Sequence, residues 1–532
     1  MAYIATFDVG TTAVKAVLVS LDVDVTTYKR EPLSAQIDGV MSSVSVTLPA
    51  SEHEMGHHEQ NPDDWWRCFL EAWRTVLHEA GSHVSAQEVV GIILSGQMQD
   101  VIVLDAQGKP LRQAMLYSDG RAAHEAATLE ERYGSQRFLD IVGNRCEGSL
   151  PLPKLMWIQQ HEAEIYSNIA HVLFDAKDYI ISRLTGKFVG DVTACSTVGA
   201  MNIHTRAWED SLIATAGIDI ALFPHLHVPS DVVGNVSQEV ALSSAFISGT
   251  PVYAGIGDAG ATTLASGVAR SGQYNINIGT SGWIAGISNE AITDDLGVAN
   301  LACTTPSGFI NGVPFLNAGG IHGWATRVFA AADQSPHNSS NRATQQEYER
   351  MSHLLADSEP GSHGVLCLPY FVGERFPVMN ADIRGAFVGI GMESNASDLA
   401  RACLEGVAFS LRQGMERFES VADEITLIGG GARERVWCQI IADVLGHRIE
   451  VFDNAETMPA VALAYIVLWS HQQHNEVQTV ELLSDASIDR MMQSLRAQTH
   501  SVMVEVDTQN VQVYDRAYER FCKLYPAVSS MQ

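Results

Sequence analysis

The sequence lacks several features that would each point to a particular class of protein. Its eight cysteines form no CxxC pair and no zinc-like spacing, and a chain of 532 residues needs no disulfide framework in order to fold. Its most apolar stretch, residues 460–469, is far too short to span a bilayer. Lys and Arg number 33 against 62 Asp and Glu, and a net charge of −29 disfavours a nucleic-acid partner, because phosphate backbones demand a basic surface.

These absences predict a large protein with reduced thiols and with neither nucleic acid nor membrane as a partner. The first residues predict a strand directly, without the basic and apolar regions of a signal peptide, so we expect a cytoplasmic protein. The length favours two or more domains. Long linkers rich in Pro, Gly and Ser are missing, which predicts a short crossing between the domains. The sequence leaves the oligomeric state open, and a homodimer is one assembly that it allows.

One sequence pattern occurs twice, once in each half. Residues 4–12, Ile-Ala-Thr-Phe-Asp-Val-Gly-Thr-Thr, are an apolar run that ends in an acid and a tight turn. Residues 276–282, Ile-Asn-Ile-Gly-Thr-Ser-Gly, repeat this pattern with Asn277 in the place of Asp8. Such a hairpin presents backbone N–H groups and hydroxyls at its tip, and these groups bind phosphate. Two hairpins predict two similar domains, 1–270 and 271–532, that face one polyphosphate.

Only the first hairpin carries a carboxylate. Asp8 is a candidate Mg²⁺ ligand, because Mg²⁺ prefers one or two carboxylates together with phosphate oxygens and water. An acid at this place can also be a hydrogen-bonded turn residue and nothing more. Lys15 could meet a phosphate as a point charge, or it could be a solvated strand residue. The other expected phosphate-binding residues of the two hairpins are Thr11, Thr12, Gly279, Thr280 and Ser281.

Residues 251–258 predict another strand that ends in an acid. Ala259, Gly260 and Ala261 follow Asp258, so the backbone leaves the sheet and opens space around the carboxylate. Asp258 could cap the next helix. It could also accept the proton of a substrate hydroxyl that attacks a phosphoryl group, and the two roles are compatible.

Glycines in the second half indicate where a nucleoside could lie. Gly429, Gly430 and Gly431 follow a predicted strand at 425–428 and precede a helix. A triple glycine alone is weak evidence, since tight turns and close helix packing also use Gly. Its position, one domain's length after the second hairpin, favours a nucleoside lying against bare backbone. Gly319 and Gly320, before a helix predicted at 320–332, give a weaker signal of the same kind.

Other segments predict the scaffold. Asn61 is expected to cap a helix whose first turn holds Pro62 and two acids. His53, His57 and His58 fall in an expected polar loop and match no metal-ligand spacing. Residues 333–345, rich in Ser and Asn, predict a surface loop. Further helices are predicted at 122–133, 152–161, 176–184, 259–267 and 396–418.

Seven short motifs, in this order, resemble the FGGY carbohydrate kinases. They are Phe7–Thr12, Gly96–Met98, Tyr117–Arg121, Gly257–Asp258, Asn277–Gly282, Leu368–Arg375 and Ile428–Arg433. The resemblance extends from residue 3 to residue 469 and more loosely beyond. It implies an α/β protein of two ribonuclease H- and actin-like domains, with mixed sheets flanked by helices, around a cleft. Sugar would bind mainly on the first domain and ATP mainly on the second, with Mg²⁺ near Asp8 of the first domain.

The resemblance also implies residue roles. Asp258 matches the catalytic base, and Asp8 matches the acid near the metal and the transferred phosphate. Gly279, Thr280 and Gly431 match nucleotide-binding positions, while Met98 and Gln99 fall where the family holds its sugar. The implied reaction is phosphorylation of a sugar hydroxyl by ATP, with D-xylulose as the expected acceptor and D-xylulose 5-phosphate as the product.

Alternatives remain within and outside this enzyme class. Another ketose, a polyol or a sugar acid could be the acceptor, because three features depart from the pattern of the most similar members. Gln99-Asp100 stands for His-Gly, Ala259 for Asn, and Tyr117-Ser118 for Trp-Asn. The same hairpins would also serve an actin- or heat-shock-like ATPase, and a catalytically inactive sugar sensor is disfavoured because Asp8 and Asp258 are intact.

Overall fold

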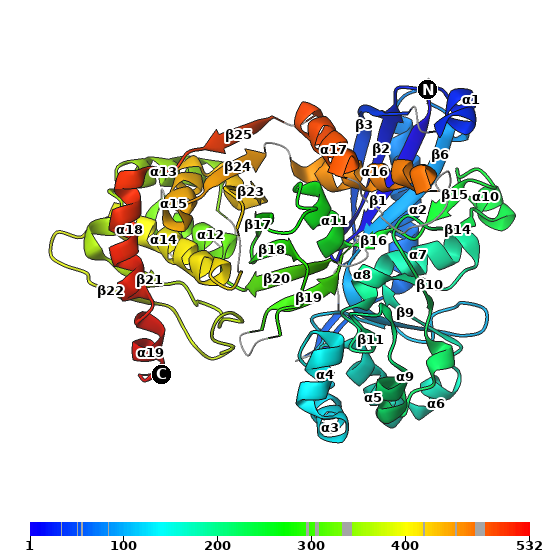
Figure 1. The fold of residues 1–532 in the computed structure, drawn as a ribbon, viewed down its shortest axis with the longest axis horizontal. Helices are drawn as coiled ribbons and strands as arrows, with labels where there is room; N and C mark the ends of the chain where they lie inside the picture. Colours follow the sequence, from blue (N-terminus) through cyan, green and yellow to red (C-terminus); the bar gives the residue numbers. More distant parts are fainter. Residues whose placement is uncertain are drawn as a thin grey trace.

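The structure is a computed structural model with two α/β halves. It describes residues 1–32, 35–49, 52–54, 57–82, 84–293, 297–303, 308–331, 343–418, 421–452, 455–473, 485–498 and 500–531. The halves lie side by side along the long axis, with the N-terminus on one and the C-terminus on the other (Figure 1). Each half is built around a seven-stranded sheet.

The first sheet has the strand order β14-β15-β6-β1-β2-β3, with β16 also paired to β6. β1 is antiparallel to β2 and parallel to β6, so the Gly-Thr-Thr turn joins two neighbouring strands. The strands are β1 (Tyr3–Val9), β2 (Ala13–Leu21), β3 (Ile37–Thr47), β6 (Val89–Gly96), β14 (Val232–Asn235), β15 (Pro251–Tyr253) and β16 (Ile256–Gly257).

The second sheet repeats the arrangement around its own hairpin. Its order is β19-β20-β18-β17-β23-β24-β25, with β17 antiparallel to β18 and parallel to β23. The predicted duplication of the hairpin is therefore confirmed. The strands are β17 (Tyr274–Ile278), β18 (Gly282–Ser288), β19 (Ala299–Ala302), β20 (Phe309–Phe315), β23 (Glu424–Ile428), β24 (Arg448–Phe452) and β25 (Ser501–Val504).

Helices cover both sheets at the places that the sequence predicts. In α2 (Pro62–Glu79) the side chain of Asn61 accepts a hydrogen bond from the backbone N–H of Asp63 at 3.0 Å, which confirms the expected cap. Its apolar face, with Trp65 and Phe69, is buried against the first sheet. The other predicted helices are confirmed as α3 (Ala123–Tyr133), α5 (Pro151–His161), α7 (Ala176–Thr185), α11 (Asp258–Ala265), α12 (Gly319–Phe329) and α14 (Ala396–Met415).

One helix of the second half packs on the first sheet. α16 (Met458–Gln473) follows β24 in the chain, yet it contacts β1, β6 and α11 (Figure 1). Its buried Val467 belongs to the same core cluster as Ile4 and Ile93 of the first sheet. Burial of this apolar helix joins the halves on one side.

The structure corrects two expectations about local structure. The expected strand at 251–258 is broken into β15 and β16, because Gly255 has a φ of +67° and passes close to the carbonyl oxygen of Leu94. His57 and His58 do not lie in a loop: they begin strand β5 (His57–Gln60), which pairs with β4 (Glu52–Glu54) and β8 (Ala114–Met115). Residues 333–342 of the expected surface loop lie outside the described residues.

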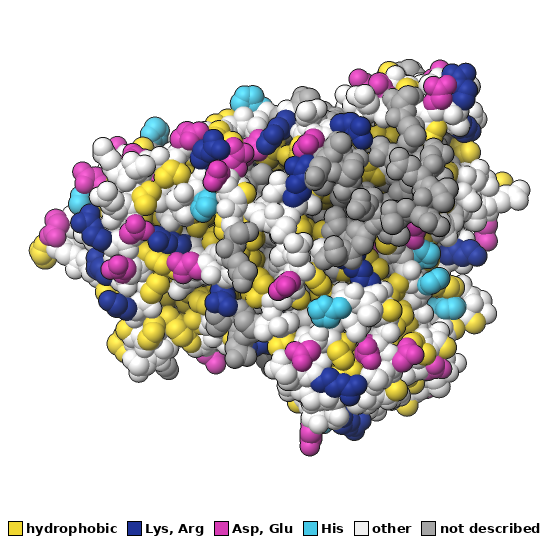
Figure 2. Space-filling view, in the orientation of Figure 1, with side chains coloured by type: hydrophobic (Ala, Val, Ile, Leu, Met, Phe, Trp, Pro, Cys, Tyr) yellow, Lys and Arg dark blue, Asp and Glu magenta, His cyan; other side chains and the backbone are white. Residues whose placement is uncertain are grey.

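On the face drawn in Figure 2, acidic and basic side chains are interspersed over both halves. None of the described helices combines the length and the apolar character that a bilayer crossing requires.

The break at Gly255 generates a stability prediction. A Cβ at Gly255 would lie 2.0 Å from the carbonyl oxygen of Leu94, so Gly255→Ala is expected to lower the free energy of unfolding by about 2–4 kcal/mol in urea titrations. Gly249→Ala is the matched control: its φ is +87°, but a Cβ there meets no atom within 4 Å. We expect a loss of only about 1 kcal/mol for the control. Equal losses in the two variants would show that the close approach to Leu94 contributes nothing.

Candidate functional site

The first sheet brings the two candidate carboxylates to one edge. β6 lies between β1 and β16, and the pairing places both Asp8 and Ile256 opposite Ser95. Neighbouring strands are about 4.8 Å apart, so the backbones of Asp8 and Ile256, which precedes Asp258 by two residues, are separated by about 10 Å. The two residues that the sequence singled out separately therefore flank the carboxyl end of the same strand.

Asp8 has the chemistry of a Mg²⁺ ligand. Its Oδ1 accepts a hydrogen bond from the Ser95 hydroxyl at 2.8 Å. Burial raises the pKa of this carboxyl, and the Ser95 hydrogen bond and the charge of Lys15 offset only part of the effect. A half-buried carboxylate at a phosphate-binding turn, with too little positive charge around it, fits the oxygen-donor preference of Mg²⁺.

Asp258 is held at the start of α11 with its carboxyl group in the same region. Gly257 is the N-cap residue and Asp258 the first residue of the helix, so the expected capping role is not the one observed. The carboxylate Oδ1 accepts a hydrogen bond from the backbone N–H of Ala259 at 2.7 Å. Burial and the negative charge of Asp8 raise the pKa of Asp258 to about 7. A carboxylate with this pKa can accept a proton near neutral pH.

The expected sugar-binding loop packs directly against Asp258. Met98 and Gln99 begin β7 (Met98–Leu104), immediately after β6. A Cβ on Gly257 would lie 2.1 Å from the sulfur of Met98, so the loop and the Asp258 turn touch at the backbone of Gly257. Gln99 adopts a φ of +64°, and its side-chain amide lies 3.5 Å from the carbonyl oxygen of Thr197. Met98 thus packs against the turn that leads to Asp258, and Gln99 follows it in the chain.

Two buried titratable residues, Lys154 and Asp100, lie beneath this loop. The ammonium of Lys154 donates to the carbonyl oxygens of Gln99 at 3.2 Å and of Leu116 at 2.6 Å. Asp100 and Lys154 are both fully buried. Burial raises the pKa of Asp100 well above its usual range and lowers that of Lys154 to about 8. Asp100, a departure from the family pattern, therefore lies beneath the sugar loop and not on its surface.

His58 of β5 contacts Ser118, which belongs to another departure from the pattern. The His58 ring nitrogen Nδ1 lies 2.7 Å from the Ser118 hydroxyl, and the His58 backbone N–H donates to Asp119 at 2.8 Å. Asp119 is fully buried and pairs with the guanidinium of Arg121 at 2.5 Å. β5, which the sequence predicted as a loop, thus holds the segment after β8 in place.

In the second half, glycines from three segments line one cavity of about 720 Å³. The backbone N–H of Gly319 donates to the carbonyl oxygen of Gly279 at 2.9 Å, so the start of α12 lies directly on the hairpin. A Cβ added at Gly319 would lie 2.2 Å from the carbonyl oxygen of Gly279, and a Cβ added at Gly431 would lie 2.4 Å from the Ile278 side chain. The sequence-predicted residues that line the cavity are Gly279, Thr280, Gly319, Gly430 and Gly431.

Several cavity-lining residues carry no sequence motif and were missed. His322 of α12 lies with its ring centre 5.2 Å from that of Tyr348, and burial lowers its pKa to about 4. Tyr348 and Ser352 come from α13 (Gln345–Ala356). The only local signal for this helix was its capping box, Thr344 with Glu347.

Four predicted phosphate-binding residues do not line this cavity. Thr12 and Ser281 are exposed at the two hairpin tips, and the backbone carbonyl of Thr11 accepts a hydrogen bond from Gln60 at 2.7 Å. The Lys15 ammonium donates to the backbone carbonyl of Glu456 in the second half. Lys15 therefore connects the first hairpin to the opposite half, and it is not a solvated strand residue.

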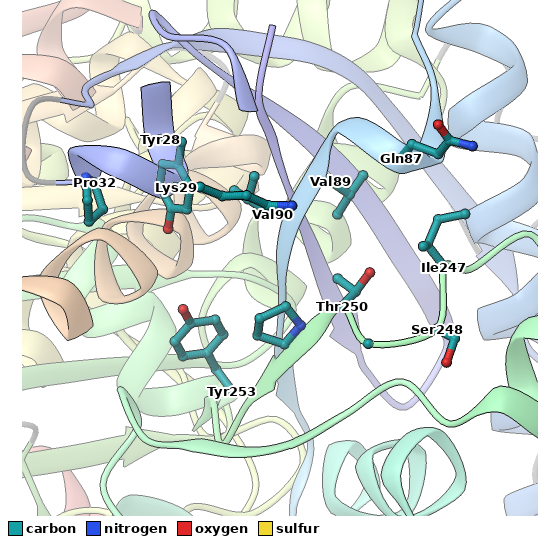
Figure 3. A pocket seen from close by; sticks show the side chains of 12 residues that line it. Tyr28, Lys29, Pro32, Gln87, Val89, Val90, Ile247, Ser248, Thr250 and Tyr253 are labelled. Atoms are coloured by element: carbon teal, nitrogen blue, oxygen red, sulfur yellow. The ribbon is translucent and has the colours of Figure 1, made fainter. Parts of the chain in front are cut away.

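A separate pocket lies at the opposite edge of the first sheet. Its volume is about 410 Å³, and it is lined by the amino-terminal ends of β6 and β15. Figure 3 shows the rings of Tyr28 and Tyr253 on one side of it, with Lys29 extending towards Val90. Since Asp8 and Asp258 lie at the carboxyl ends of the strands, this pocket is not part of the candidate site.

Comparisons with known proteins match this chain to one family. The N-terminal domain of the FGGY family of carbohydrate kinases matches residues 3–265, and its C-terminal domain matches residues 274–468. A xylulose kinase of Bacillus subtilis (strain 168) is 30% identical over 471 residues, 88% of each chain. A gluconokinase of the same strain is 27% identical over 86% of this chain and 85% of its own.

A solved structure extends the likeness to the fold. The xylulose kinase from Rhodospirillum rubrum superposes with a TM-score of 0.82 at 26% identity, over 99% of each chain. The expected α/β fold of two actin-like domains is thereby confirmed. The comparisons also decide for a carbohydrate kinase, and against an actin- or heat-shock-like ATPase or an inactive sensor. The chain belongs to the FGGY family of carbohydrate kinases.

Proposed function

We propose that this kinase transfers the terminal phosphate of ATP to D-xylulose and forms D-xylulose 5-phosphate. The observation that carries the proposal is that Asp258, with a pKa of about 7, lies within reach of the charge of Asp8 and follows the turn against which Met98 packs. The relatives named xylulose kinase support this choice of acceptor. A neighbouring carboxylate that is half-ionised at neutral pH can take a proton from the attacking hydroxyl.

Asp258 acts as the general base, and the rest of the site supplies position and charge. Met98 and Gln99 orient the sugar so that its terminal hydroxyl meets Asp258. Asp8 would hold Mg²⁺, which supplies charge neutralisation on the phosphates when it is bound. Phosphoryl transfer needs little covalent chemistry from the protein, so alignment of hydroxyl, base and phosphate provides most of the acceleration.

The second half supplies the nucleotide site. The nucleoside lies in the cavity against Gly430 and Gly431, and the phosphates extend to Gly279, Thr280 and Ser281. Thr11 and Thr12 contribute backbone N–H groups or hydroxyls, and Gly319 lines the cavity with bare backbone. Lys15 reaches a phosphate by exchanging its contact with the Glu456 carbonyl.

The remaining parts of the proposal concern the domain boundary, the location, the oligomeric state and a second candidate acceptor. We place the domain boundary at residues 270 and 271, between the two matched family regions. We also propose a cytoplasmic location, where the eight thiols stay reduced, and a homodimer. A sugar acid is the second candidate acceptor: the gluconokinase likeness supports it, and so does Ala259, which cannot supply the amide of an Asn.

A panel of sugars tests the proposed acceptor. The purified protein is given Mg-ATP with ketoses, polyols and aldonates, and ADP release and product mass are measured together. We expect D-xylulose to give the highest kcat/KM and a phosphorylated product. Faster turnover of ribulose or gluconate would contradict the acceptor, and ADP release without any phosphorylated sugar would contradict the function. The matched control is Asp258→Asn. Its turnover should fall about a thousandfold, while its binding of ATP should be retained.

The pH dependence tests the role of Asp258. Only the ionised carboxylate can accept a proton, so kcat/KM should rise with pH and level off above an apparent pKa of about 7. Below that value the rate should fall about tenfold per pH unit. The measurement is kcat/KM for the sugar from about pH 5 to about pH 9, with the ATP concentration saturating. A flat profile through neutrality would contradict a titrating base at this position.

Gly430 offers a test of the nucleotide cavity that leaves the fold intact. A Cβ at Gly430 meets no atom within 4 Å, so Gly430→Val should not change the thermal midpoint of unfolding. If the nucleoside lies against this backbone, the added side chain should raise KM for ATP about tenfold or more, which is about 1.4 kcal/mol. The KM for the sugar should stay unchanged. Gly39→Val, equally free of neighbours but in β3, is the control, and an unaltered KM for ATP at Gly430→Val would refute the placement.

A further inference from the structure

A short buried helix contacts both the expected sugar-binding loop and the strand that leads to Asp258. α8 (Val192–Cys195) packs against β7, which carries the sugar loop, and against β16, which leads to Asp258. The Cβ of Ala194 lies 3.3 Å from the Cβ position of Gly257, and the Cγ2 of Thr193 lies 3.1 Å from that of Gly260. These two glycines lie on either side of Asp258 in the chain. α8 therefore touches the backbone that holds the base.

The other side of α8 binds the edge of the second sheet. β19 is the last strand of that sheet, so one row of its backbone groups points away from the ladder. The Thr193 hydroxyl donates to the carbonyl oxygen of Ala302 at 2.8 Å, and the Ala302 N–H donates to the Ser196 hydroxyl at 3.1 Å. Thr193, Ser196 and Ala302 are all fully buried. These hydrogen bonds satisfy both outward groups of Ala302 without any strand pairing.

The same strand is held at a second point. The side chain of Asn144, from the loop after α4 (Ser135–Val142), donates to the carbonyl oxygen of Asn300 at 2.7 Å. It also accepts the backbone N–H of Asn300 at 2.8 Å. We call these contacts of Asn144, Thr193 and Ser196 with Asn300 and Ala302 the β19 seam. Side chains of the first half thus bond to the backbone groups at the open edge of the second sheet.

α8 is fixed firmly to the first half. The carboxylate of Asp191 accepts the backbone N–H groups of Thr193 at 2.9 Å and Ala194 at 3.0 Å, which caps the helix. Its other oxygen lies 2.7 Å from the ammonium of Lys177, and both side chains are fully buried. A helix held by a buried ion pair and by its cap moves with the loop and strand on which it packs.

We propose that Thr193 and Ser196 are positioning residues that couple sugar binding to ATP binding. The proposal rests on the proposed function, because it takes the sugar to lie on Met98, Gln99 and Asp258. A sugar bound there fixes the segments on which α8 packs, and α8 holds β19. β19 pairs with β20, and β20 with β18, which begins at Gly282 beside the second phosphate hairpin. Sugar therefore favours the arrangement in which this hairpin faces Asp8.

Thermodynamic linkage makes this coupling measurable. If sugar stabilises the arrangement that binds ATP, sugar must tighten the binding of ATP by a definite factor. The probe is AMP-PNP with Mg²⁺, titrated calorimetrically with and without the sugar that gives the fastest turnover. In the unaltered enzyme we expect sugar to lower the Kd of AMP-PNP about tenfold.

The test variant carries Thr193→Val and Ser196→Ala, which remove the seam's hydroxyls with little change in volume. Its Kd for AMP-PNP without sugar should stay within about twofold of the unaltered value, while the effect of sugar should fall to about twofold or less. The control variant carries Thr215→Val and Ser167→Ala. Their hydroxyls bond to backbone carbonyls close by in their own chain segments, Ser211 at 2.7 Å and Glu164 at 2.8 Å. The control should keep the full tenfold effect of sugar.

Distinct outcomes separate this inference from the proposed function. Full coupling in the test variant, or an unaltered enzyme without any coupling, would overturn the role of the seam while sugar phosphorylation stands. Weaker AMP-PNP binding in the absence of sugar would also overturn it, because the hydroxyls would then be merely structural. If the double variant fails to fold, Ser196→Ala alone is used, with about half of the logarithmic effect lost. A panel without any phosphorylated sugar would contradict the proposed function and this coupling together.

Discussion

The chemistry that we propose for this kinase depends on two carboxylates held near each other against their mutual repulsion. Asp8 and Asp258 lie on either side of β6, and both carry raised pKa values because burial and, for Asp258, the charge of its neighbour disfavour ionisation. The sheet fixes this spacing through backbone pairing, which side chains cannot relax. The same arrangement creates a demand for positive charge near Asp8 and a proton acceptor at Asp258. One electrostatic constraint thus yields both a metal-binding propensity and a base.

The two candidate binding regions are built by different physical means. In the second half, backbone approaches backbone: Gly319 meets Gly279, and Gly431 meets Ile278, at distances that exclude any side chain. Such a site recognises a nucleotide by shape and by N–H groups, so its sequence signature is a set of glycines. The sugar side relies on side chains, with Gln99 held from below by Lys154 and Ser118 held by His58. Side-chain chemistry can change without disturbing the sheet, and the departures from the family pattern lie there.

Local signals were sufficient for the hairpins, the Asn61-capped helix and the cavity glycines, because each depends on residues adjacent in sequence. The break at Gly255 could not be predicted in the same way, since it follows from the position of Leu94 in another strand. His57 and His58 look like loop residues until β8 provides a pairing partner. Asp100 was singled out only as a departure from the family pattern, and only the structure shows that its side chain is fully buried. His322 carried no signal in the sequence, because its place in the cavity depends on its contact with Tyr348 of α13.

The two joints between the halves differ in how they respond to movement. On one side, α16 rests on β1 and β6 through apolar contacts, which lose free energy gradually as surfaces slide or rotate. On the other side, the β19 seam consists of buried hydrogen bonds, which are lost within a few tenths of an ångström beyond their normal length and leave costly unpaired groups. Rotation about the apolar joint would therefore either make or break the seam, with little between. If the proposed coupling holds, these two joints give the enzyme two discrete arrangements, which would let it exclude water until both substrates are bound.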